Sequence, residues 1–161
     1  MARAYAKRLR AALAMVDKRR VNAQETEVMD IMGEVDGKTA LIVDDLVSTA
    51  GSLVEAVRAL KQAGAREVYA AITHPVLSGP ARERLTQSPL KELVVTDTIP
   101  IPADRMLPKI TVLSVAPLFA EAIRRIHEEE SLTILFQEHW EEGAKKEEPK
   151  MEKLKMQKVK R

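Results

Sequence analysis

The chain has 161 residues, contains no cysteine and carries a formal net charge of +2. Hydrophobic residues make up 45% of it and charged residues 31%, a mixture typical of globular proteins, while aromatic residues at 3% require a core of aliphatic side chains. The lack of cysteine excludes disulfide frameworks and thiolate metal sites. Because no apolar run is long enough for a membrane span and the basic amino terminus has no signal-like apolar stretch, we expect a cytoplasmic location.

The first twenty residues predict a helix, a short strand and a loop. Residues 2–13 mix Ala, Leu and Arg in a helix-forming composition. The apolar run 14–16 indicates a short strand, and the basic cluster 18–20 that follows is expected in an exposed loop. A short basic cluster of this kind is most often a solvated surface feature.

A hairpin and a buried strand are expected next. Residues 27–35 alternate partly, and the turn dipeptide Asp36-Gly37 is expected to close a hairpin onto the following strand, 39–43. That strand is apolar throughout, which is typical of a strand covered on both faces in a parallel sheet.

Beyond this strand, helices and strands alternate along the chain. The predicted helices are 52–63, 80–86 and 116–129, and the predicted strands are 67–73, 92–96 and 109–115. Such alternation predicts an α/β fold with a doubly wound, mostly parallel sheet and helices on both faces.

The last 25 residues differ in composition from the rest. Residues 1–136 carry 18 basic and 18 acidic side chains, whereas 137–161 carry 8 basic and 6 acidic ones and few apolar residues. We therefore expect one domain at 1–136 and a charged, flexible tail at 137–161. Glutamates interrupt the lysines of the tail, so that a solvated extension is favoured over a nucleic-acid-binding segment.

The stretch LIVDDLVSTAGSL, residues 41–53, is the strongest candidate for a binding site. Asp44 and Asp45 stand at the expected carboxyl end of a parallel strand, where ligands of open α/β sheets bind. The small residues that follow lead into a helix, so their backbone N–H groups and hydroxyls can surround a phosphate. These residues are Ser48, Thr49, Ala50, Gly51 and Ser52.

A ligand with two different ends fits this arrangement. Two carboxylates repel a purely anionic ligand but accept hydrogen bonds from vicinal hydroxyls, so a sugar phosphate such as ribose 5-phosphate satisfies both parts. Gly51 permits the close approach of a phosphate. The competing interpretation is that Asp44, Asp45 and Ser48 are ordinary turn and helix-capping residues.

The segment VDDLVSTAGS resembles the ribose-phosphate-binding loop of the phosphoribosyltransferase type I fold. Further segments narrow the resemblance to the ribose-phosphate diphosphokinase (phosphoribosyl pyrophosphate synthase) family. These segments are ARAYAKRL, VDKRR, EVM, THPVLSGPA, KELVVTDTIP and VLSVAPLFAEAIRRIH, and they extend over residues 2–136. The match is to the carboxy-terminal portion of that family.

The resemblance implies a phosphoribosyltransferase type I-like fold and a defined reaction. Members transfer the diphosphate of ATP to the 1-hydroxyl of ribose 5-phosphate, using Mg²⁺, and supply phosphoribosyl diphosphate for nucleotide biosynthesis. Asp44 and Asp45 would hold the ribose hydroxyls and a possible divalent cation, and Ser48 to Ser52 the 5-phosphate. Lys18 and Arg20 match basic residues of the family's catalytic loop, which closes over the ATP phosphates.

The sequence also departs from the family pattern in three places. Ser48 replaces an acidic residue of many members, and VNAQET after Arg20 lacks the usual prolines. Met1 corresponds to a point well inside a complete synthase, so that the adenine pocket and the main magnesium ligands are expected outside this chain. The chain is therefore expected to need an amino-terminal half, and to form an oligomer with itself, with that half or with a full-length synthase.

Two other functions stay open at this stage. One is a non-catalytic regulatory or associated subunit of a complete synthase, and the other, weaker one is a small phosphoribosyltransferase. Of the histidines, His74 is expected to be a loop residue before Pro75, His127 to be structural or solvated late on a helix, and His139 to belong to the tail.

Overall fold

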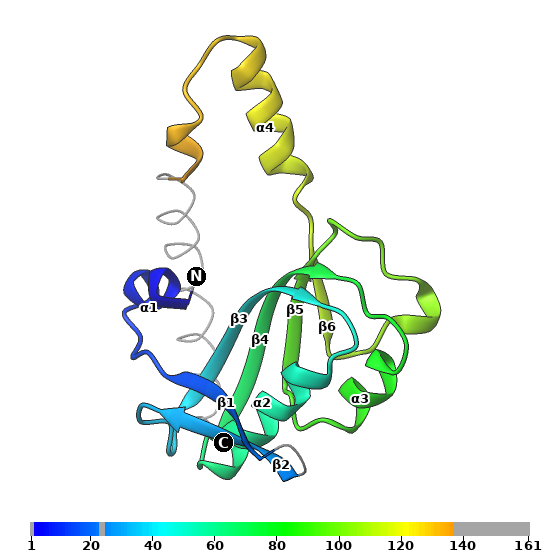
Figure 1. Ribbon diagram of the computed structural model, residues 1–161. Helices are drawn as coiled ribbons and strands as arrows, with labels where there is room; N and C mark the ends of the chain where they lie inside the picture. Colours follow the sequence, from blue (N-terminus) through cyan, green and yellow to red (C-terminus); the bar gives the residue numbers. More distant parts are fainter. Residues whose placement is uncertain (1, 23–24, 137–161) are drawn as a thin grey trace, which may run out of the picture. The chain divides into compact units, whose positions relative to one another are not determined.

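The computed structural model describes residues 2–22 and 25–136, and the side chains of residues 17–22 and 25–29 lie outside that description. Contacts divide the chain into two compact units, residues 1–114 and 115–161. In chain order the elements are α1 (Ala2–Leu9), β1 (Met15–Asn22), β2 (Glu25–Met32), β3 (Thr39–Val47), α2 (Gly51–Gln62), β4 (Glu67–Pro75), α3 (Ala81–Gln87), β5 (Glu92–Thr96), η1 (Ala103–Arg105), β6 (Ile110–Leu113), α4 (Ala116–His127) and η2 (Thr133–Phe136) (Figure 1).

The first unit is organised around a parallel sheet with the strand order β3-β4-β5-β6. All three neighbouring pairs are parallel, with Ile42 opposite Ala70, Ala70 opposite Leu93, and Leu93 opposite Ile110. The crossovers between these strands contain α2, α3 and η1. The predicted α/β fold with a mostly parallel sheet is confirmed.

One face of the sheet forms the core. Val68, Ala70 and Ile72 of β4 alternate with partly exposed residues, and each has at most 4% of its surface exposed. They belong to one apolar cluster with the fully buried Val57 of α2 and Leu85 of α3. Alternate strand residues point to opposite faces, so the other face carries the remaining positions. On it Leu41 is 46% exposed and Leu113 is 55% exposed.

The first sheet strand does not pair with the segment before it. The Asp36-Gly37 turn forms, with the Lys38 N–H donating to the Val35 carbonyl at 3.0 Å, but β2 pairs with β1 as an antiparallel ribbon and not with β3. The predicted hairpin onto β3 is therefore wrong. Instead the turn contacts the end of α2, because the Gly37 N–H donates to the carbonyl of Gly64 at 2.9 Å.

The basic cluster 18–20 lies in a strand and not in the predicted loop. β1 continues through Asn22, and its backbone pairs Lys18 with Met29 and Arg20 with Glu27. Alternation of apolar and polar residues in the antiparallel partner was visible only in part of 27–35, so the pairing partner that extends β1 was missed. Other boundaries differ from the predicted ones by a few residues at each end.

The second unit contains α4 and η2. The helix predicted at 116–129 forms as α4, but it has no buried residue, and Phe119, Ile123 and Ile126 are each more than half exposed. The tail 137–161 lies outside the described residues, so the predicted boundary after residue 136 stays a prediction. Among the described residues, no helix is both long enough and apolar enough to cross a bilayer.

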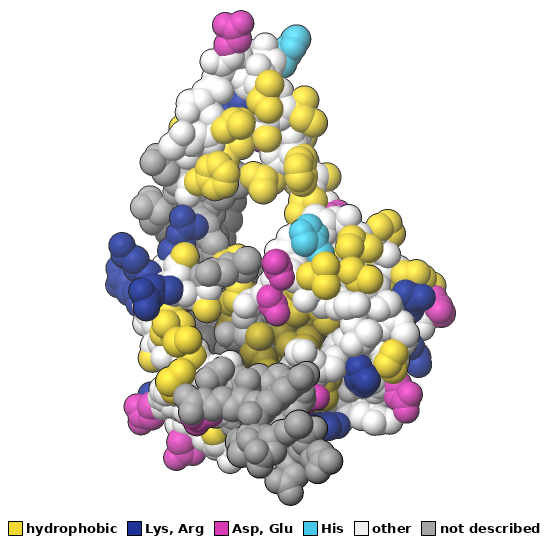
Figure 2. Space-filling view, viewed as in Figure 1, with side chains coloured by type: hydrophobic (Ala, Val, Ile, Leu, Met, Phe, Trp, Pro, Cys, Tyr) yellow, Lys and Arg dark blue, Asp and Glu magenta, His cyan; other side chains and the backbone are white. Residues whose placement is uncertain are grey.

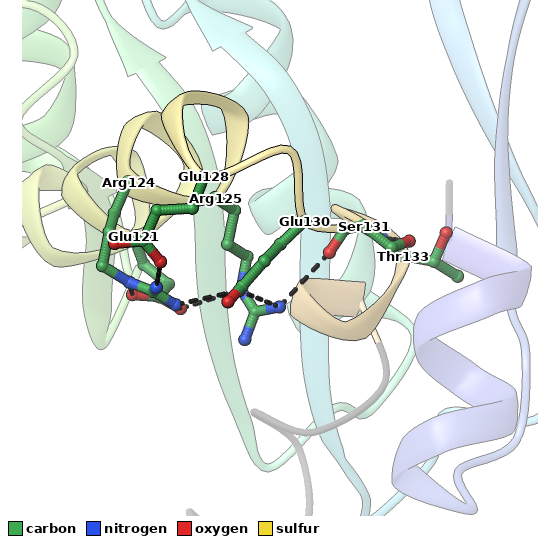
Figure 3. A network of polar contacts seen from close by, with 7 residues as sticks. All are labelled: Glu121, Arg124, Arg125, Glu128, Glu130, Ser131 and Thr133. Atoms are coloured by element: carbon green, nitrogen blue, oxygen red, sulfur yellow. Dashed lines mark hydrogen bonds and ion pairs between the residues drawn. The ribbon is translucent and has the colours of Figure 1, made fainter.

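Ion pairs connect the end of α4 to the chain that follows it (Figure 3). Glu121 accepts hydrogen bonds from Arg124 and from Arg125, both at 2.8 Å. Arg124 also pairs with Glu128 and with Glu130. The hydrogen bond from the Arg124 guanidinium, opposed by some burial and assisted by Arg125, lowers the pKa of the Glu121 carboxyl to about 2.

Substitution of Leu93 by Ala is expected to destabilise the first unit by about 2–5 kcal/mol, because Leu93 is fully buried and its loss leaves a cavity. Leu41→Ala on β3 is the matched control, since Leu41 is about half exposed and its loss should cost well under half as much. Urea unfolding measures both changes in the free energy of unfolding, provided that the dependence of this free energy on urea concentration keeps the same slope. Equal losses would contradict the placement of the core.

Protonation of Glu121 is expected to loosen α4 in acid. Because its folded pKa is below the ordinary value of 4.5, its ion pairs contribute fully above about pH 4.5 and are lost as the pH falls toward about 2. NMR titration of the side-chain carboxyl carbons should give a midpoint near 2 for Glu121. A midpoint near 4.5 would show that the ion pairs do not form in solution.

Candidate ligand-binding site at the carboxyl end of the sheet

The candidate site lies where β3 passes into α2. β3 extends to Val47, four residues beyond the predicted end, so Asp44 and Asp45 lie within the strand, near its carboxyl end. Asp44 is opposite Ile72 of β4, and Val47 is opposite Pro75. A loop of three residues, 48–50, then leads to Gly51, the first residue of α2. The two aspartates therefore lie in the carboxyl-terminal half of the strand, as part of it, and not just beyond its end as predicted.

The two carboxylates are exposed but not equivalent. Consecutive residues of a strand point to opposite sides, so Asp44 and Asp45 diverge and do not form one clamp. One oxygen of Asp44, Oδ1, accepts a hydrogen bond from the Asp45 backbone N–H at 2.9 Å. The other oxygen of Asp44 and both oxygens of Asp45 can therefore receive hydroxyl donors from a ligand.

The loop residue Ala50 takes a left-handed conformation. Its φ of 57° and ψ of 11° are uncommon for a residue with a Cβ, and its side chain is 4% exposed. The turn delivers the chain into α2, whose first N–H groups have no acceptor within the helix, and no side-chain cap accepts from them. Such a turn before a helix presents N–H donors to an anion, as predicted for a phosphate.

The neighbouring connection after β4 fixes this loop in place. The Leu77 N–H donates to the Val47 carbonyl at 3.1 Å, and the Ser78 N–H donates to the Ser48 carbonyl at 3.0 Å. The hydroxyls of Ser48 and Ser78 lie 3.0 Å apart and share a further hydrogen bond. Ser48 therefore joins two loops, and its hydroxyl is partly committed to that contact.

Arg84 of α3 is a residue of this site that the sequence analysis missed. Its Nη1 donates to the Thr49 carbonyl at 3.0 Å, so the guanidinium lies against the loop. A side chain at position 51 would come within 3.1 Å of the same nitrogen, so the arginine would have to shift slightly to accommodate it. The signal in the sequence was weak, because Arg84 is separated from the loop by more than thirty residues and lies in a short helix with other charged residues.

His74 lies in β4 and not in the loop in which it was expected. It is opposite Leu46 of β3, and its ring nitrogen Nδ1 is 2.9 Å from the hydroxyl of Thr98. Figure 2 shows histidine and acidic side chains exposed together over the carboxyl ends of the sheet strands. This edge of the sheet therefore combines carboxylates, an imidazole, N–H donors and a guanidinium.

Comparison with known proteins agrees with this geometry. The family model described as phosphoribosyl synthetase-associated domain matches residues 15–137, which is most of the chain. The chain belongs to this family. Curated relatives include a ribose-phosphate pyrophosphokinase of Caldanaerobacter subterraneus subsp. tengcongensis, 59% identical over 135 residues, and one of Clostridium acetobutylicum, 56% identical over 136 residues.

A solved structure supports the fold of this phosphoribosyl synthetase family member. The crystal structure of phosphoribosylpyrophosphate synthetase from Mycobacterium smegmatis matches with a TM-score of 0.71 and 38% identity, over 80% of this chain and 42% of that one. The curated relatives match over 84% of this chain and 43% of their own length. The chain thus spans less than half the length of these relatives.

Other predicted site residues stay predictions. The backbone of Lys18 and Arg20 lies in β1, and their side chains are outside the described residues. Asp44 and Asp45 remain the predicted metal ligands, but among the residues that the structure describes no group of three His, Asp or Glu side chains is placed to hold a metal ion.

Arg84→Gln is expected to weaken the binding of inorganic phosphate by about three- to tenfold, because a charge-assisted contact beside the N–H donors is lost. Calorimetric titration measures the effect, which should shrink at high salt. Arg82→Gln is the matched control, since Arg82 is also exposed on α3. An equal effect of the two substitutions would exclude a local role for Arg84.

Proposed function

We propose that this chain carries the ribose 5-phosphate-binding part of a ribose-phosphate diphosphokinase. The observation that supports the proposal best is the connection from β3 to α2. There exposed carboxylates at Asp44 and Asp45 are followed within six residues by a left-handed turn at Ala50 and the N–H donors of α2. This order of groups fits a molecule with hydroxyls at one end and a phosphate at the other.

The phosphate would lie against the loop and the first turn of α2. The N–H groups of residues 50–53 and the hydroxyls of Thr49 and Ser52 are its donors, and the helix dipole favours its charge. Arg84 adds a positive charge on one side of the loop. Ser48, whose hydroxyl already pairs with Ser78, contributes mainly by holding the loop against its neighbour.

The ribose ring would extend from the loop toward the carboxylates. Hydroxyl donors bonded to Asp44 or Asp45 form charge-assisted hydrogen bonds, which are stronger than neutral ones. Because Asp44 and Asp45 point to opposite sides of β3, a single ribose ring can lie over only one of the two carboxylates. The other carboxylate can reach the ring only around the end of the strand. Asp44 lies opposite the buried Ile72, on the side of the sheet that α2 covers, so we assign it the closer contact.

The reaction proposed for the complete site is diphosphate transfer. The 1-hydroxyl oxygen of ribose 5-phosphate attacks the β-phosphorus of ATP, the bond from that phosphorus to the oxygen of AMP breaks, and the hydroxyl proton passes to a base or to water. Binding ribose 5-phosphate at both ends fixes the 1-hydroxyl, and such positioning supplies much of the rate in phosphoryl transfer.

The remaining groups of the reaction are proposed from the family. Lys18 and Arg20 would stabilise charge on the ATP phosphates, and Mg²⁺, held partly by Asp44 or Asp45 together with substrate phosphates, would neutralise the transferred group. Because the chain spans less than half of its relatives' length, we propose that the ATP-binding part comes from a complementing amino-terminal half or from a full-length synthase with which the chain assembles. Assembly of the chain with itself, in a homo-oligomer, is also proposed.

A second candidate function is a non-catalytic subunit that assembles with a complete synthase. It is favoured by apolar side chains that the described residues leave exposed on the open face of the sheet, among them Leu41, and by the position of β3 at the edge of the described four-stranded sheet. Exposed apolar strand edges often receive another chain. Two results would support this function over the first. The chain would co-purify with a complete synthase, and the activity of that complex would not change when Asp44→Asn is introduced into this chain.

Replacing both carboxylates, Asp44→Asn and Asp45→Asn, is expected to reduce the affinity for ribose 5-phosphate at least tenfold, because charge-assisted hydrogen bonds to two hydroxyls become neutral ones. The affinity for inorganic phosphate should stay unchanged or rise slightly, since two negative charges are removed near the loop. Calorimetric titration of the full chain with both ligands measures this.

The control is Asp104→Asn, which removes an exposed carboxylate from η1. It should leave both affinities unchanged. If the folded wild-type chain binds inorganic phosphate but shows no preference for ribose 5-phosphate, the proposed substrate is wrong, although the phosphate site is right.

A further inference from the structure

His74 is the first member of a hydrogen-bonded cluster at the carboxyl ends of β4 and β5. Its Nδ1 is 2.9 Å from the Thr98 hydroxyl oxygen, which is 2.9 Å from the Thr96 hydroxyl oxygen. Both hydroxyls also approach the Thr73 carbonyl, Thr96 at 2.7 Å and Thr98 at 3.0 Å. The cluster is partly buried, so its protons must be shared among few partners.

Counting protons in this cluster shows which tautomer of His74 is favoured. The Thr73 carbonyl can only accept, and each threonine hydroxyl has one proton to donate. The four close contacts join His74 to Thr98, Thr98 to Thr96, and each threonine hydroxyl to the Thr73 carbonyl. If Thr98 donates its proton to His74, only the Thr96 proton is left, so two of the four contacts have no proton. If His74 donates from Nδ1, both hydroxyl protons remain for the other contacts, and only one contact has no proton. The second arrangement is therefore favoured.

A neutral His74 with its proton on Nδ1 has a bare lone pair on Nε2. Among the residues that the structure describes, no hydrogen-bond partner contacts Nε2. The imidazole is thus held by one nitrogen and offers an acceptor at the other. The side chain is only partly exposed, which limits the competition from water for this acceptor.

The position of His74 places this acceptor close to the proposed sugar site. Asp44 is opposite Ile72 on the neighbouring strand, and His74 lies two residues beyond Ile72, toward the same carboxyl edge. Strand spacing and rise then separate the Cα atoms of Asp44 and His74 by about 8 Å. A sugar ring fits between side chains at that separation and can hydrogen-bond to both.

We propose that His74 is a further sugar-binding residue of this site, held by Thr98 in the Nδ1–H form so that Nε2 accepts a hydrogen bond from a ribose hydroxyl. This inference rests on the proposed function. It assigns Thr98 the role of a positioning residue, because Thr98 acts on the ligand only through the imidazole.

NMR of the full chain labelled with ¹⁵N tests the tautomer first. At about pH 8, above the range in which an ordinary imidazole titrates, long-range ¹⁵N–¹H correlations should show the proton of His74 on Nδ1. Thr98→Val removes the acceptor for that proton and should shift the tautomer toward Nε2–H. A wild-type His74 with its proton on Nε2 would overturn the proposal, whatever the ligand.

Ligand binding tests the contact itself. His74→Asn keeps an N–H donor at the place of Nδ1 but removes Nε2, so we expect the affinity for ribose 5-phosphate to fall about three- to tenfold. His74→Gln can reach the Nε2 position with its amide oxygen and should lose less. Neither substitution should change the affinity for inorganic phosphate, which a merely structural role would also alter. His127→Asn, in the second unit, is the control.

The outcomes separate this proposal from the function on which it rests. If wild-type chain fails to prefer ribose 5-phosphate over inorganic phosphate, the proposed function fails and the His74 contact fails with it. If wild-type chain shows that preference and His74→Asn retains it in full, the proposed function stands and the His74 contact alone is overturned.

Discussion

The parallel pairing of β3 with β4 determines where the two aspartates and His74 lie in the candidate site. It brings Asp44, Leu46 and Val47 level with Ile72, His74 and Pro75, and it directs both strands toward the same edge. The connections that leave this edge are then close enough to bond to one another, as Ser48 and Ser78 do. If the register slipped by one residue, Asp44 would exchange sides and these contacts would be lost.

Burial on one face of the sheet stabilises that register. The apolar residues of β4 and β5 pack with α2 and α3 in a single cluster, so both helices are held against the same face of the sheet. This packing accounts for the left-handed Ala50, which lets the chain turn from a strand into a helix that must lie on the core face. Strain at one residue is tolerated because the surrounding core fixes the residues on both sides of it.

Much of this arrangement could be predicted from the sequence. The apolar run before Asp44 and the helical pattern predicted at 52–63 are local signals, and they correctly located a strand and the helix that follows it, although β3 continues four residues beyond its predicted end. The contact of Arg84 with Thr49 could not be predicted, since it depends on how α3 packs beside α2. The pairing of β1 with β2 was missed for a related reason, because strand partners are chosen by contacts far apart in the chain. The cluster of His74 with Thr96 and Thr98 likewise requires the order of β4 and β5 in the sheet.

In the proposed function, the β3 to α2 connection binds ribose 5-phosphate in a defined orientation. The most direct measurement is NMR mapping of ribose 5-phosphate on the full chain with assigned backbone amides. We expect the amides of residues 49–53 to shift with ribose 5-phosphate and with inorganic phosphate, and those of Asp44 and Asp45 to shift with ribose 5-phosphate alone. Saturable binding that shifts amides elsewhere and leaves residues 44–53 unchanged would contradict the proposed function.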